Sequence, residues 1–182
     1  DLLGILALES ARGNFIVVGE DLGTVAPGAR HRLAENGVLS YRLLWFEKQD
    51  FPEQSAVSIT THDLPTLAGF YAARDIEARR AAHMIDEEEY ARQIEHRKTE
   101  IAKLDETLAR AGFAGDPLGF ALATPSRIAI VNQEDLTGET EQQNVPGTTW
   151  QHPNWRRKMK IAVEELGPLA QRLREKIIFS KR

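Results

Sequence analysis

The chain has 182 residues, 42% of them hydrophobic and 27% charged, which is enough for one ordinary domain with a packed core. Its formal net charge of -4 excludes the surplus of lysine and arginine that nucleic-acid binding requires. The chain has no cysteine, which excludes disulfides and thiolate metal sites, and no apolar run approaches the roughly 20 residues that span a membrane.

The first part of the chain alternates helical patterns with short apolar runs. Apolar residues at helical spacing predict a helix over 2–11. The run at 15–18 is continuously apolar and is typical of a strand buried on both faces. A proline at its start and a glycine after its end favour a helix over 27–36. Further strands are predicted over 40–46 and 56–60.

The second part is richer in helices. A short helix is predicted over 67–73, and a long charged helix over 86–111 with an apolar seam and a solvated face. A fourth strand is expected at 128–131 and a loop at 138–153. A final helix is predicted over 155–178, interrupted by a Gly-Pro pair.

Strands separated by helices predict a parallel α/β fold, and four such units amount to half of a (β/α)₈ barrel. The chain begins inside an amphipathic pattern without an initiator methionine, which favours a fragment of a longer protein. The edge strands at 15–18 and 128–131 are then expected to be exposed, so the isolated chain is expected to self-associate.

Two carboxylates follow predicted strands directly. Glu20 follows the first strand and Asp63 the third, at the end of parallel strands where barrel enzymes place their chemistry. Glycosidic chemistry requires a carboxylic acid on the leaving oxygen and carboxylates that stabilise an oxocarbenium-like transition state. A helix cap or an ion pair is the alternative for each residue. Gly19 and Gly23 flank the first site and let a backbone approach a ligand closely.

Weaker candidates each have an ordinary structural alternative. Tryptophans stack on sugars or pack in cores, asparagines bind hydroxyls or form turns, and strand-end residues line a rim, pack or cap helices. These candidates are Trp150, Trp155, Asn144, Asn154, Trp45, Glu47 and Asp135. The histidines lack metal-ligand spacing, so neither a metal nor a cofactor is expected.

Three separated motifs resemble those of the 4-α-glucanotransferases, glycoside hydrolase family 77 of the α-amylase clan. They read VGEDLGTV at 18–25, SITTHDLPTLAG at 58–69, and NVPGTT at 144–149 with HPNWRRK at 152–158. The resemblance spans nearly the whole chain, and LES at 8–10 is similar to the bacterial branch.

The resemblance implies a (β/α)₈ barrel of which residues 1–182 form the C-terminal part, about strands five to eight, with a helical insertion at about 71–115. Glu20 matches the general acid/base, and Asp63 the aspartate that holds substrate hydroxyls and stabilises the transition state. His62 matches a neighbouring sugar ligand, and Asp21, Asn144 and Trp155 are further substrate-binding candidates. The nucleophilic aspartate has no match here and is expected upstream of the chain.

The implied activity is transfer of α-1,4-glucan segments between maltooligosaccharides by a retaining mechanism in the cytoplasm. The isolated chain is expected to be inactive, because it lacks the nucleophile. Two rival hypotheses stay open. One is a glucan-binding α/β domain without catalysis, and the other is an unrelated α/β domain that interacts through its long helix.

Overall fold

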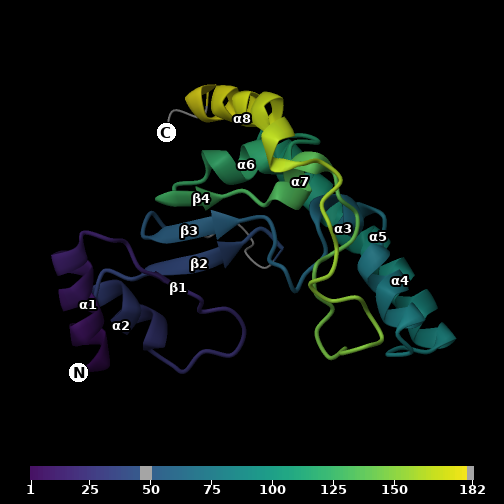
Figure 1. Cartoon of the computed structure of the whole chain (residues 1–182), viewed down its shortest axis with the longest axis horizontal. Helices are drawn as coiled ribbons and strands as arrows, with labels where there is room; N and C mark the ends of the chain where they lie inside the picture. Colours follow the sequence, from purple (N-terminus) through teal and green to yellow (C-terminus); the bar gives the residue numbers. More distant parts are fainter. Residues whose placement is uncertain (46–50, 180–182) are drawn as a thin grey trace. The chain divides into compact units, whose positions relative to one another are not determined.

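The computed structural model describes residues 1–45 and 51–179, which form two compact units. The first unit consists of Asp1–Ser58 together with Thr124–Ile130 and holds the sheet. The second consists of Ile59–Ala123 and the chain from Val131 onward, and its regular structure is helical. Figure 1 shows the elements of both units.

The sheet has four strands, all parallel, in the order β1-β2-β3-β4 (Figure 1). They are β1 (Val18–Gly19), β2 (Leu39–Leu43), β3 (Ser55–Ser58) and β4 (Ile128–Ile130). Spatial order thus follows chain order, as it does around a barrel wall. The predicted parallel α/β class is confirmed.

Burial is greatest at the middle of the sheet. All four residues of β3 are buried, and Leu39 and Leu43 of β2 are almost fully enclosed. The run before β1 is different, since Phe15 is 48% and Ile16 54% exposed. The prediction that 15–18 is buried on both faces is therefore wrong for this chain: β1 is an edge strand, and only Val18–Gly19 pair with a neighbour.

Two helices accompany the sheet in the first unit, α1 (Leu2–Gly13) and α2 (Ala29–Glu35). The helix α1 ends where Asn14 takes a left-handed conformation (φ 50°), which asparagine tolerates better than most residues. The helix α2 contacts β2. Together β1, α2 and β2 form the βαβ unit that the alternation of patterns predicts.

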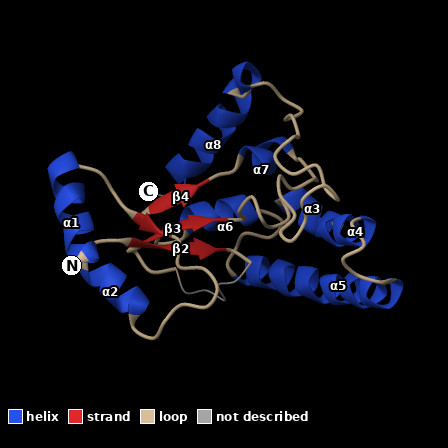
Figure 2. Cartoon of the chain, turned by 60° about the horizontal axis from the view of Figure 1, so that its bottom comes forward, coloured by secondary structure: helices blue, strands red, loops and turns tan. Residues whose placement is uncertain are grey.

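The second unit contains seven helical segments in its described residues: α3 (Leu67–Tyr71), α4 (Arg74–Ala81), α5 (Glu87–Arg110), α6 (Pro117–Ala123), α7 (Gln133–Thr137), η1 (Val163–Glu165) and α8 (Gly167–Phe179). Figure 2 shows α5 as a long helix with α3 and α4 on one side of it. Its start matches the prediction because the Asp86 carboxylate accepts a hydrogen bond from the Glu89 backbone N–H at 2.8 Å. No described helix is long and apolar enough to cross a membrane.

The predicted final helix begins too early. Residues 155–162 are irregular, and α8 begins only at Gly167, so Pro168 stands in the first turn of a helix instead of interrupting one. The reason is tertiary: the Lys160 backbone N–H, inside the predicted helix, donates to the Glu139 carboxylate at 2.7 Å instead of to a helical carbonyl. The candidate Glu47 and the end of the predicted second strand lie outside the described residues.

Candidate functional site

Glu20 lies immediately after β1 and its side chain is exposed. The chain turns sharply there, because the backbone N–H of Asp21 donates to the carbonyl of Gly19 at 3.0 Å. Gly19 suits this close approach, since a Cβ on it would stand 3.0 Å from Cγ1 of Val38, which would have to move by a few tenths of an ångström. The sequence thus presents Glu20 at the carboxyl end of an edge strand, free to meet a ligand.

Asp21 points the other way, into the first unit, with only 2% of its side chain exposed. Its Oδ2 accepts from Ser40 Oγ at 2.6 Å and from Arg30 Nε at 3.0 Å, and its Oδ1 accepts from the Tyr41 backbone N–H at 2.9 Å. Burial opposes ionisation of this carboxylate, but the hydrogen bonds outweigh it and hold the pKa of Asp21 below its usual range. Because both oxygens are already engaged, the geometry argues against the expected contact of Asp21 with sugar.

Tyr41 connects this network electrostatically to Glu20. Burial raises the pKa of the Tyr41 phenol, a hydrogen bond with Ser58 opposes the rise, and the negative charge of Glu20 adds to it. Tyr41, Ser40 and Arg30 were not singled out from the sequence. These residues lie nine to twenty positions from Asp21 in the sequence, so no local pattern predicts that they contact it.

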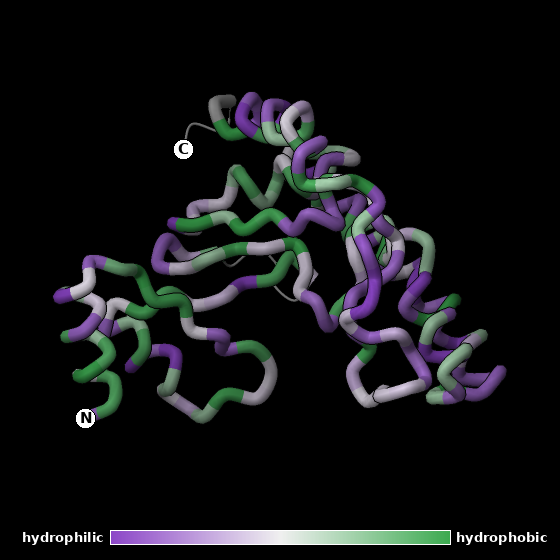
Figure 3. Tube along the Cα trace, viewed as in Figure 1, coloured by the Kyte–Doolittle hydropathy of each residue, from purple (hydrophilic) through white to green (hydrophobic). Residues whose placement is uncertain are grey.

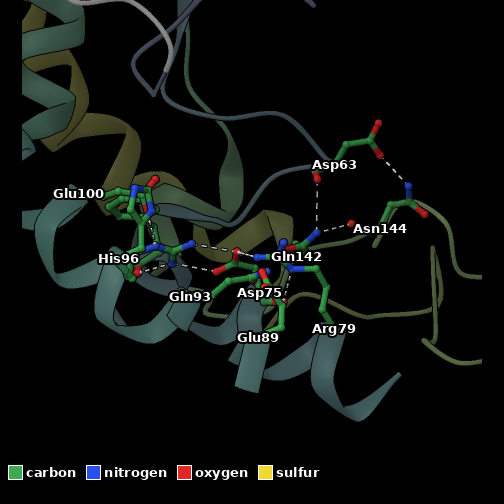
Figure 4. Close-up of polar contacts among 11 residues, drawn as sticks. Asp63, Asp75, Arg79, Glu89, Gln93, His96, Glu100, Gln142 and Asn144 are labelled. Atoms are coloured by element: carbon green, nitrogen blue, oxygen red, sulfur yellow. Dashed lines mark hydrogen bonds and ion pairs between the residues drawn. The ribbon is translucent and has the colours of Figure 1, made fainter. Parts of the chain in front are cut away.

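In the second unit, two predicted site residues, His62 and Asn144, converge on the carboxylate of a third, Asp63. Oδ1 of Asp63 accepts a hydrogen bond from Asn144 Nδ2 at 2.6 Å (Figure 4). The same oxygen lies 3.4 Å from His62 Nε2. The Asp63 side chain is 45% exposed and that of His62 51%, so both can still meet a ligand. A half-exposed carboxylate with an amide and an imidazole beside it is suited to holding vicinal hydroxyls.

Gln142 holds the backbone of this cluster in place, and the sequence did not indicate it as a site residue. It is buried, and its Nε2 donates to the Asn144 carbonyl at 2.5 Å and, more weakly, to the Asp63 carbonyl at 3.4 Å (Figure 4). The Asn144 backbone N–H in turn donates to the carbonyl of His62 at 3.2 Å. The loop after α7 is thereby joined to the segment after β3. The amide-rich run 142–144 is the sequence signal for it.

Trp155 borders the same cluster. Its ring centroid lies 5.0 Å from that of His62 at a 49° tilt, and 63% of the residue is exposed. The loop that carries it is ordered by Asn154, whose Oδ1 accepts from the Val145 backbone N–H and whose Nδ2 donates to Thr148 Oγ1 at 2.8 Å. Trp150 is 85% exposed. Neither tryptophan is a core residue in the described conformation, which leaves both free to stack.

Asp135, the candidate after β4, is a helix cap. Its Oδ1 accepts from the backbone N–H of Leu67 at 2.7 Å, at the first turn of α3. Burial raises the pKa of Asp135 to about 6, against that hydrogen bond and with a smaller contribution from Glu134. Within residues 1–45 and 51–179, no group of three or more His, Cys, Asp or Glu side chains is arranged to hold a metal ion.

The six site residues thus fall into two groups. His62, Asp63, Asn144 and Trp155 gather in the second unit, and Glu20 and Asp21 belong to the first. The fold defines a class: a parallel α/β protein with acidic side chains just beyond strand ends, the placement that (β/α)₈ enzymes use.

The family within that class follows from comparison. A family model described as 4-alpha-glucanotransferase matches residues 1–163. The 4-alpha-glucanotransferases of Mycobacterium bovis and Mycobacterium tuberculosis are 32% identical over 206 residues, an alignment that covers 100% of this chain and 28% of each relative. That of Haemophilus influenzae is 29% identical over 185 residues and 87% of this chain. The chain belongs to the 4-alpha-glucanotransferase family.

Solved structures agree with this assignment. The crystal structure of amylomaltase from Corynebacterium glutamicum superposes with a TM-score of 0.83 at 25% identity, over 100% of this chain and 30% of that one. Amylomaltase from Streptococcus agalactiae in complex with acarbose gives 0.58 at 19% identity, over 96% and 34%, and at this identity shows the fold alone. The chain spans about 28% of the length of the curated relatives named first.

Proposed function

We propose that the chain supplies the acid/base and transition-state-binding part of a retaining 4-α-glucanotransferase acting on maltooligosaccharides and α-1,4-glucans. The observation that carries the proposal is the cluster at Asp63, where His62 and Asn144 converge on a half-exposed carboxylate inside a family-matched segment. We further propose that this enzyme acts in the cytoplasm, as expected from the resemblance.

In the proposed reaction each proton has a donor and an acceptor. An aspartate outside this chain attacks the anomeric carbon while protonated Glu20 gives its proton to the leaving glycosidic oxygen. The 4-hydroxyl of an acceptor sugar then gives its proton to Glu20 as its oxygen bonds to the same carbon, which releases the aspartate. Asp63 and His62 hold sugar hydroxyls, and the Asp63 charge stabilises the cationic transition state.

The roles of the supporting residues follow from their contacts. Asn144 directs Asp63 by donating to its Oδ1, and the exposed ring of Trp155 offers a stacking surface beside His62. The helices α4 and α5 fall within the predicted insertion at about 71–115. We propose that this segment is an addition to the C-terminal part of the barrel.

The test is incubation of maltotriose with the full-length enzyme, meaning a protein of the relatives' length that contains this chain, and with residues 1–182 alone. Chromatography is expected to show glucose and a ladder of longer maltodextrins from the full-length enzyme only. The Glu20→Gln variant of the full-length enzyme is expected to lose about 10²- to 10⁴-fold in rate. The matched control Glu9→Gln, an exposed carboxylate on α1, keeps the parent rate.

Two outcomes would contradict this assignment. A ladder from residues 1–182 alone means that a carboxylate of this chain is the nucleophile. Maltooligosaccharide binding that survives Glu20→Gln, without turnover by the full-length enzyme, indicates a glucan-binding domain without catalysis.

A further inference from the structure

The turn that carries Glu20 is fixed to β2 on its N-terminal side. Gly19 is the ladder partner of Ser40, and the missing side chain of Gly19 lets the strand pack closely against Val38 and Leu33. The backbone just before Glu20 is therefore held by the sheet.

The same turn is fixed to β2 on its C-terminal side by Asp21. The two carboxylate oxygens of Asp21 reach the hydroxyl of Ser40 at 2.6 Å and the backbone N–H of Tyr41 at 2.9 Å. Glu20 is thus the single residue between two attachments to the same stretch of β2. Such double anchoring limits the positions that its own side chain can reach.

Arg30 of α2 completes the anchorage from a second direction. Its Nε donates to the Asp21 carboxylate at 3.0 Å and its Nη2 to the Asp21 carbonyl at 2.8 Å. The guanidinium therefore holds both the side chain and the backbone of Asp21. It also neutralises a carboxylate whose side chain is only 2% exposed.

We propose that Asp21 is a positioning residue that sets the place of the Glu20 carboxyl group for proton transfer. The inference rests on the proposed function, and it gives Asp21 a different part from sugar binding. A general acid has to stand within hydrogen-bond reach of the leaving oxygen, and a shift of about 1 Å costs on the order of 10²-fold in rate. Asp21 acts through the backbone of its neighbour and touches no substrate.

The dependence on the leaving group separates positioning from a general structural role. Cleavage of maltotriose releases a sugar alkoxide, a poor leaving group that needs the proton of Glu20. α-Maltosyl fluoride releases fluoride, which needs little help from an acid. In the full-length Asp21→Asn variant, kcat for maltotriose is expected to fall about 10- to 100-fold with KM changed less. The initial burst of fluoride release from α-maltosyl fluoride is expected to stay within about threefold of the parent rate, since that step bypasses the proton donor.

The matched control is Asp116→Asn, in which the carboxylate also accepts a backbone N–H, from Gly119 at 2.9 Å, and pairs with Lys176. This variant is expected to keep the parent rate with both sugar substrates, maltotriose and α-maltosyl fluoride. An Asp21→Asn enzyme with the parent kcat on maltotriose overturns the positioning role alone. An equal loss of rate with maltotriose and with α-maltosyl fluoride also overturns it, because it indicates damage to the whole site. A parent enzyme without transfer activity contradicts the proposed function and the inference together.

Discussion

At the scale of single residues, the site depends on how each carboxylate is bonded by the protein and how far it is exposed. Asp21 and Asp135 accept backbone N–H hydrogen bonds, whereas Glu20 is exposed and Asp63, which accepts from Asn144 through Oδ1, keeps 45% of its side chain exposed. Carboxylates bonded to the backbone hold structure in place, and exposed ones can meet a ligand. This division explains why neighbours in sequence, Glu20 and Asp21, are given different roles.

The contact between Asn144 and Asp63 makes a strong prediction. In Asn144→Asp a second carboxylate replaces the donor that lies 2.6 Å from Asp63 Oδ1, and like charges at that distance repel. Transfer activity of the full-length enzyme is expected to fall at least about 100-fold, measured as glucose released from maltotriose. The control Asn36→Asp changes an amide at the C-cap of α2 that donates to the Arg32 carbonyl, and it is expected to leave the rate unchanged. Parent-level activity of Asn144→Asp would contradict the role given to this contact.

The raised pKa of Asp135 leads us to expect that stability depends on pH. The raised pKa of about 6, against 3.8 ordinarily, means that the folded state keeps a proton that the unfolded state releases between these values. The free energy of unfolding therefore falls as pH rises from about 4 to about 6, by on the order of 1 to 3 kcal/mol. In Asp135→Asn this loss is expected to disappear, so the change in Tm between pH 4.5 and pH 7 becomes smaller. The control Glu95→Gln, at an exposed carboxylate, is expected to keep the parent slope. An unchanged slope of Tm against pH in Asp135→Asn would count against a raised pKa of Asp135 as the cause.

The sequence identified Glu20 and Asp63 because strand ends are visible as the end of an apolar run. It left Asp21 among the sugar ligands, because its partner Ser40 is 19 residues away and Arg30 lies on a different element. Contacts of this kind depend on the strand register, which local pattern does not specify. The same limit hid Gln142, whose partner Asp63 is 79 residues distant.

At the scale of elements, the helical part of the second unit is organised around a buried ion pair. Arg97 of α5 donates to Asp75 of α4 through two nitrogens, at 2.8 and 2.9 Å, and to the Phe70 carbonyl of α3 at 2.8 Å. Its guanidinium also lies 4.2 Å from the centroid of the Phe70 ring. One arginine thus joins three helices.

Removing one charge of this pair is expected to be costly. Asp75→Asn removes the buried carboxylate that pairs with Arg97 and leaves it the half-exposed Glu100, 3.1 Å from Arg97 Nε, at a cost of about 3 to 5 kcal/mol in unfolding free energy. Glu106→Gln removes the same charge from an exposed pair with Arg110 and is expected to cost less than about 1 kcal/mol. Urea denaturation of both variants provides the comparison. Similar midpoints for the two would mean that the buried pair does not stabilise the helices.

Elements with local signals were predicted well, and those fixed by distant contacts were not. The long helix α5 was expected at 86–111 and extends over Glu87–Arg110, since Asp86 caps its start. The segment 155–162 carries a helical pattern but is irregular. The Lys160 backbone N–H donates to the buried carboxylate of Glu139 at 2.7 Å, a contact that a helix would break.

At the scale of the whole chain, many large hydrophobic side chains of residues 1–45 and 51–179 are exposed. The trace of α1 is mostly hydrophobic (Figure 3), yet none of its residues is buried, and Leu2, Ile5 and Leu8 are 83%, 57% and 50% exposed. The edge residues Val18 of β1 and Ile130 of β4 are also exposed. The expectation that these two strands form the sheet edges is confirmed, and exposure holds for Phe15, Ile16 and Val18 at one edge and for Ile130 at the other, while the consequence for association stays a prediction.

Residues 1–182 alone are expected to self-associate through these surfaces. Analytical ultracentrifugation is expected to show a mass that rises with protein concentration. The double variant Val18→Lys and Ile130→Lys places charges on both edges and is expected to reduce the association. A monodisperse, cooperatively folding monomer of the unmodified chain would count against the hypothesis that residues 1–182 are part of a (β/α)₈ barrel.

The most direct test of the central claim is to locate the covalent intermediate. The full-length Glu20→Gln variant, given α-maltosyl fluoride, is expected to form the glycosyl-enzyme but to lack the base that resolves it. Mass spectrometry of its peptides is predicted to find the added sugar on an aspartate outside these 182 residues. A sugar attached to Asp63, or to any other carboxylate of this chain, would contradict the roles assigned to Glu20 and Asp63.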